Sequence, residues 1–170
     1  LPPVKKVFNS VKKIEPEKIL YDYQKKIKDR LVKTLISDEK KVLVKMPTGS
    51  GKTRTSIEAL IDYWRFNSKK NDILVWLANQ EELCQQACDS FEEFWKIRGD
   101  RSLNIYKFWG NHKLKKEDIK DGGIIIAGFD KFHSARLKPT AESSLLTSNI
   151  RSRTRLILID EAHMCMAPTY

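Results

Sequence analysis

The sequence predicts an α/β fold in which a mostly parallel β-sheet carries helices on both faces. Short apolar segments at 73–78, 124–127 and 156–160 alternate with longer amphipathic segments at 52–66 and 80–98. Strands that are apolar throughout are typical of parallel sheets whose two faces are both covered. Ligands of such sheets bind beyond the carboxyl ends of the strands, so we expect the functional residues there.

Length and charge restrict the class of protein. A chain of 170 residues suits one domain. Lys and Arg number 32 against 22 Asp and Glu, a formal charge of +10. This surplus favours a polyanion such as nucleic acid as partner, although a generally basic surface without a dedicated partner is the alternative. No apolar run is long enough to cross a bilayer, so we expect no membrane span.

The cysteines indicate a reducing compartment. An odd number, Cys84, Cys88 and Cys165, without a signal peptide predicts reduced thiols in a cytoplasmic protein. Cys84 and Cys88 lie four residues apart in one apolar stripe of a predicted helix. No further Cys or His lies nearby, so we interpret them as core residues and not as metal ligands.

The remaining elements are read from their patterns. Residues 1–14 form a basic lead-in, and 15–170 form the domain. A helix is expected from Pro16 to about Ser37, because four leucine and isoleucine residues share one face at about 100° per residue. Strands are expected at 42–46 and 103–108. A charged loop with four lysines is expected at 111–121, and an irregular basic segment at 133–154.

The glycine-rich segment MPTGSGKT at 46–53 predicts a phosphate-binding loop between a strand and a helix. Glycines let successive backbone N–H groups point at phosphate oxygens, and the helix that follows adds the positive end of its dipole. Lys52 is expected on the β- and γ-phosphates of a nucleotide, and the Thr53 hydroxyl on Mg²⁺. The strict pattern has glycine where this chain has Met46. The residues expected to cradle the phosphates are Pro47, Thr48, Gly49, Ser50, Gly51, Lys52 and Thr53.

Two carboxylates follow the last apolar strand, at Asp160 and Glu161. Adjacent strand residues point to opposite sides, which suits two different tasks. We expect Asp160 to hold Mg²⁺ through water and Glu161 to orient and deprotonate the attacking water. An acidic pair alone often only ends a strand, but a phosphate loop upstream supplies the partner that a nucleotide hydrolase needs.

These motifs resemble the first, RecA-like motor domain of a superfamily 2 helicase of the DEAH-box or restriction-enzyme type. MPTGSGKT resembles motif I, and DEAH at 160–163 resembles motif II. LYDYQ at 20–24 resembles the Q motif, and LANQ at 77–80 with ELCQQ at 82–86 resembles motif Ia. The resemblance implies ATP and Mg²⁺ as cofactors and a second motor domain as partner. It assigns adenine recognition to Gln24 and nucleic-acid contacts to Asn79, Gln80 and Gln85. It assigns coupling between the ATP site and other motifs to His163, for which a surface-loop histidine is the alternative.

Two positions need separate comment. Gln24 falls on the apolar face of its predicted helix, where an unpaired amide would cost about 1–3 kcal/mol. Adenine would satisfy it, and a bond to a nearby loop backbone is the alternative. Gly128 stands where the family usually has a phosphate-contacting threonine, so a nucleic-acid contact there is in doubt. The chain stops before the second motor domain, which would supply an arginine finger, so we expect it to bind ATP but hydrolyse it poorly.

The sequence therefore predicts the ATP-binding domain of a DNA helicase or translocase of restriction or repair type, with a bacterial character. An RNA helicase and a non-catalytic nucleotide- or nucleic-acid-binding module of a larger assembly are the alternatives. A small-molecule kinase would need neither DEAH nor so basic a surface. The lysines of 113–120 and the arginines of 136–155 are expected near the path of the nucleic acid.

Overall fold

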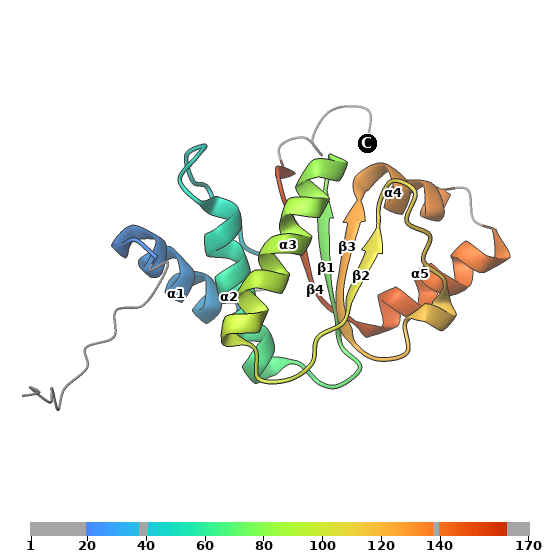
Figure 1. Ribbon diagram of the computed structural model, residues 1–170, viewed down its shortest axis with the longest axis horizontal. Coiled ribbons are helices and arrows are strands. Elements are labelled where there is room, and N and C mark those ends of the chain that lie inside the picture. Colours follow the sequence, from blue (N-terminus) through green and yellow to red (C-terminus); the bar gives the residue numbers. More distant parts are fainter. Residues whose placement is uncertain (1–19, 38–40, 138–139, 163–170) are drawn as a thin grey trace, which may run out of the picture.

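The computed structural model describes residues 20–37, 41–137 and 140–162. Four parallel strands form one sheet in the order β2-β3-β1-β4 (Figure 1). The strands are β1 (Ile73–Ala78), β2 (Ile105–Phe108), β3 (Gly123–Gly128) and β4 (Thr154–Ile159). The predicted strands at 73–78, 103–108, 124–127 and 156–160 are therefore confirmed, with ends that differ by up to two residues.

Helices cover both faces of the sheet. They are α1 (Asp22–Ile36), α2 (Lys52–Asn67), α3 (Glu81–Arg98), α4 (Phe129–Leu137) and α5 (Ala141–Arg153), with a short 3-10 turn η1 (Lys116–Asp118). In β1, Leu74 and Trp76 pack against α2 and α3, and Ile73 and Val75 face the opposite core with α5. Cys84 and Cys88 are buried on α3 in the first core, as predicted.

The first helix begins later than predicted. Leu20 and Tyr21 precede it in extended or irregular backbone, and Asp22 is its first residue. The proposed start at Pro16 lies outside the described residues. The Gln24 side chain accepts a hydrogen bond from the Tyr21 backbone N–H at 2.9 Å, which caps the helix at this point.

The structure has no strand at 42–46, so the prediction of a strand there is wrong. This segment is irregular, and Val42 and Leu43 are exposed. The apolar run is only three residues long before Lys45 interrupts it, and no described strand pairs with it. The outer edge of β4 likewise has no neighbour among the described strands, and Ile157 and Ile159 are exposed there.

The segment at 133–154, predicted as irregular, is largely helical. It contains most of α4 and all of α5. Thr140 caps α5, since its hydroxyl accepts the Ser143 N–H at 3.1 Å. Only Leu146 and Ile150 of α5 are buried, so the apolar periodicity that marks a helix is nearly absent. Among the described residues, no helix is both long and apolar enough to span a membrane.

Candidate nucleotide site

The phosphate loop lies at the carboxyl edge of the sheet and leads directly into α2. Gly49 and Gly51 have φ angles of 75° and 78°, in the left-handed region that favours glycine. The Ser50 N–H and hydroxyl donate to the Pro47 carbonyl at 3.2 and 2.6 Å, which closes the turn. Gly51 is the N-cap of α2, so the positive end of the helix dipole faces the concave side of the loop. This arrangement favours an anion.

The loop meets the acidic pair in space. Lys52 and Glu161 are separated by 109 positions in the chain, and the Lys52 Nζ lies 2.7 Å from the Glu161 Oε1. Both side chains are about one-third exposed, so a ligand can reach the pair. Glu161 has a φ of 53°, unusual for a residue other than glycine, and it lies two residues after Ile159, the last residue of β4. Backbone strain of this kind is often found at functional sites.

Asp160 lies next to this pair but is buried. Its backbone N–H donates to the Leu77 carbonyl at 2.8 Å, and its Oδ1 accepts the Glu161 N–H at 3.0 Å. Burial raises the pKa of the Asp160 carboxyl, and the positive charge of Lys52 opposes this shift. A bound divalent cation would favour the ionised carboxylate further. Asp160 and the half-buried Thr53 therefore have the oxygen donors that suit Mg²⁺.

A comparison with known protein families identifies the chain. The family described as "Type III restriction enzyme, res subunit" matches residues 17–170. The chain belongs to this family. The all-parallel sheet with helices on both faces agrees with the family, and the predicted RecA-like, superfamily 2 helicase-like fold is confirmed.

Two curated proteins are similar to this res-subunit domain. The activating signal cointegrator 1 complex subunit 3 of Dictyostelium discoideum is 24% identical over 164 residues, which are 92% of this chain and 7% of that protein. The type I restriction enzyme EcoKI endonuclease subunit of Escherichia coli (strain K12) is 26% identical over 143 residues, 83% of this chain and 11% of that protein. The chain thus spans about a tenth or less of the length of these relatives.

Gln24 of the res-subunit domain is buried against the phosphate loop. Its Nε2 donates to the Ser50 carbonyl at 2.8 Å, and Tyr23 donates its hydroxyl to the same carbonyl at 2.9 Å. A Cβ on Gly51 would lie 2.4 Å from the Gln24 Nε2, so a side chain there would displace the amide. The sequence left two partners open for the Gln24 amide, adenine and the backbone of a nearby loop. In the structure, the amide bonds to the backbone of the phosphate loop.

The predicted nucleic-acid contacts share the carboxyl edge of the sheet. Asn79 and Gln80 follow β1, and Gly128 ends β3 opposite Ala78 in the register. The Asn79 Oδ1 is buried without a hydrogen-bond partner in the described part of the chain. Gln85 lies one turn into α3, exposed, and donates to Asp89 at 2.7 Å.

Gly128 lies beside Trp109. A Cβ at this position would lie 3.4 Å from the Cβ of Trp109, which is an ordinary van der Waals contact. His163, the last predicted site residue, lies outside the described residues.

Two of the predicted basic contacts lie at the opposite edge of the sheet. Arg153 and Arg155 are at the start of β4, whereas the nucleotide site is at strand ends. Arg153 donates from its Nε to the Asn71 carbonyl at 2.8 Å, and the Arg155 Nε lies 3.2 Å from the Asp72 carboxylate. These two arginines stabilise loops at the amino-terminal edge, and the expectation that they lie near the nucleic acid stays a prediction.

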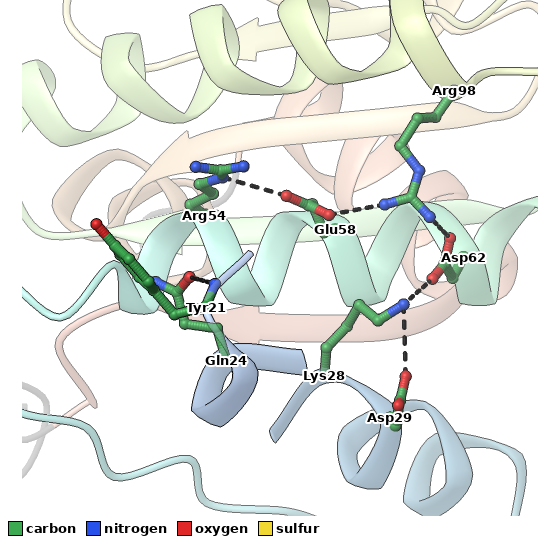
Figure 2. A network of polar contacts seen from close by, with 8 residues as sticks. All are labelled: Tyr21, Gln24, Lys28, Asp29, Arg54, Glu58, Asp62 and Arg98. Atoms are coloured by element: carbon green, nitrogen blue, oxygen red, sulfur yellow. Dashed lines mark hydrogen bonds and ion pairs between the residues drawn. The ribbon is translucent and has the colours of Figure 1, made fainter. Parts of the chain in front are cut away.

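A network of ion pairs along α2 was not predicted from the sequence (Figure 2). It joins α1, α2 and α3 through partly or fully buried charges, namely Lys28, Arg54, Glu58, Asp62 and Arg98. One signal was available: Lys28 is four residues from Gln24 and three from Leu31, on the inward face of α1.

Proposed function

We propose that this chain is the ATP-binding domain of a nucleic-acid-dependent motor ATPase, a DNA helicase or translocase of restriction or repair type. The 2.7 Å contact between Lys52 and Glu161 carries the proposal. It brings a phosphate-binding lysine and a candidate water-activating carboxylate into one site at the strand ends. Membership of the res-subunit family supports the motor assignment.

Each residue of the site has a proposed task. The backbone of 47–51 and the start of α2 bind the phosphates, and Lys52 neutralises the β- and γ-phosphates. Thr53 and Asp160 would hold Mg²⁺, which would supply positive charge to offset that of the phosphates. Glu161 accepts a proton from the attacking water once the nucleotide has drawn Lys52 away from it. His163 couples this site to other parts of the motor.

The proposed nucleic-acid partner binds at the same edge of the sheet, through Asn79, Gln80, Gln85 and the backbone at Gly128. The restriction-enzyme description of the family and of the Escherichia coli relative supports DNA. A second motor domain completes the site by supplying an arginine finger, which is worth roughly 10³–10⁵ in rate.

The full-length protein should release phosphate from ATP faster when DNA is added, because the motor closes around nucleic acid. Phosphate release is measured without nucleic acid, with DNA and with RNA, each with wild-type protein and with the Lys52→Ala variant. Stimulation by RNA alone would favour an RNA helicase. A rate that neither nucleic acid changes would favour a nucleotide-binding module.

The chain alone should bind DNA weakly and with little sequence preference, because backbone contacts dominate when no element reads bases. With Arg153 and Arg155 engaged elsewhere, we expect about three phosphates to be neutralised. The log–log slope of affinity against salt should then be about −2 to −3. Fluorescence anisotropy with labelled DNA over a salt series measures this slope. A flat dependence would indicate a protein partner for the basic surface.

Replacing Gln24 with alanine should weaken the binding of ATP more than that of GTP or UTP. We propose that the Gln24 amide hydrogen-bonds to the adenine edge when nucleotide is bound. Competition binding with the three nucleotides gives the three losses. Lys26→Ala, an exposed change two residues away, serves as the control. Equal losses for all three nucleotides would show that Gln24 only holds the Ser50 carbonyl.

A further inference from the structure

The inward face of α1 carries both the loop contacts and a charged anchor. Gln24, Lys28 and Leu31 recur at spacings of four and three residues, so they lie on one side of the helix. Gln24 and Leu31 are buried, and the Lys28 side chain is only 17% exposed. This side packs on α2, the helix that begins at the phosphate loop.

Asp62 of α2 joins three helices. Its Oδ2 lies 2.8 Å from the Lys28 Nζ of α1, and its Oδ1 lies 2.6 Å from the Arg98 Nη2 of α3 (Figure 2). The Arg98 Nη1 lies 2.7 Å from the Glu58 Oε2. Glu58 also accepts from Arg54 at 3.2 Å.

The charges of this network depend on one another. Glu58 and Asp62 are one turn apart on α2, where two carboxylates repel each other. Arg98 offsets this repulsion by bridging both, and Lys28 supplies the second cation that Asp62 needs. Burial alone would lower the pKa of Lys28, but the hydrogen bond and charge of Asp62 raise it above its ordinary value. Lys28 is therefore charged at neutral pH, and its loss would leave Asp62 with one partner fewer in a poorly solvated place.

We propose that Lys28 and Asp62 are positioning residues for the nucleotide site. Their ion pair fixes α1 on α2, so that Gln24, one turn before Lys28, holds the Ser50 carbonyl and keeps the phosphate loop in its binding shape. This inference deepens the proposed ATP-binding function and rests on it. It predicts that Lys28 influences the affinity for ATP through Gln24, although Lys28 itself lies outside the phosphate loop.

A double-mutant cycle tests this route. Lys28→Met keeps the aliphatic stem and removes the charge. We expect it to weaken Mg-ATP binding about 5- to 10-fold, because the Gln24 contact with the loop is no longer held in place. Gln24→Ala should weaken Mg-ATP binding by at least as much. The double variant should be no weaker than Gln24→Ala alone, since Lys28 acts on the site through that residue.

The controls separate positioning from simple stability. Lys28→Arg keeps the charge and should bind ATP nearly as well as wild type. Lys25→Met removes a lysine whose side chain is 48% exposed and paired with Asp22, and it should have no effect. Calorimetric titrations are made well below the melting temperature of each variant. A lower melting temperature with unchanged ATP affinity would overturn the proposal, because it would show a structural role only.

Three further outcomes are decisive. If the losses from Lys28→Met and Gln24→Ala multiply in the double variant, Lys28 does not act through Gln24 and the proposal fails. If ATP binds wild type but not Lys52→Ala, and Lys28→Met binds like wild type, the proposed function stands and only this inference is overturned. If wild type itself does not bind ATP, both the proposed function and this inference are overturned.

Discussion

Replacing Lys52 with alanine is expected to weaken ATP binding by about 100-fold, enough to remove it from a calorimetric titration. A charge-assisted hydrogen bond contributes about 1.5–3 kcal/mol, and each 1.4 kcal/mol corresponds to about a factor of ten. The structure adds a second cause. Lys52 lies 2.7 Å from Glu161, so its removal takes away a positive charge that offsets this carboxylate beside the phosphates.

This second cause can be measured separately. Adding Glu161→Gln to Lys52→Ala removes the negative charge of this carboxylate and should restore part of the lost affinity. Lys69→Ala is the matched control, because this exposed lysine lies between α2 and β1, at the other edge of the sheet. ATP affinity that is unchanged in Lys52→Ala would move the nucleotide site elsewhere.

Replacing Glu161 with glutamine should retain Mg-ATP binding and abolish most hydrolysis in the full-length protein. Glutamine has nearly the same shape but cannot accept the proton of the attacking water, and loss of a general base costs about 10²–10⁴ in rate. Because the carboxylate also competes with phosphate for Lys52, affinity should stay equal or rise. Single-turnover phosphate release and a parallel ATP titration separate the two effects.

Glu117→Gln is a suitable control, since Glu117 is an exposed residue of η1 on a surface segment. It should change neither affinity nor turnover. Turnover of Glu161→Gln close to wild type would show that another group activates the water. Loss of binding together with turnover would instead indicate that Glu161 shapes the phosphate loop.

The fold could be predicted where burial on both faces leaves an apolar run. The six residues of β1 are all buried, and both ends of this strand were predicted correctly. Helix α5 could not be found in this way, because only Leu146 and Ile150 of its side chains are buried. The segment 42–46 shows the opposite failure, since an apolar run becomes a strand only when a neighbour pairs with it.

The site could be predicted in part for a related reason. Parallel strands bring their carboxyl ends to one edge, so a strand at 42–46 would have placed the loop before α2 beside the residues that follow β4. The structure has no strand at 42–46, but it brings the loop to the same place. The Lys52–Glu161 contact is consistent with that expectation. The role of Asp62 could not be predicted, because a carboxylate on an amphipathic helix usually faces water. Its two cations come from other helices, and only tertiary packing brings them together.

A crystal structure of the chain with Mg²⁺ and a non-hydrolysable ATP analogue tests the central claim most directly. The account predicts that the analogue's phosphates lie against the backbone of 47–51. The Lys52 Nζ should contact a phosphate oxygen and no longer lie 2.7 Å from the Glu161 Oε1, and Mg²⁺ should lie near Thr53 and Asp160. An analogue bound elsewhere, or bound with the Lys52–Glu161 ion pair intact, would contradict the account.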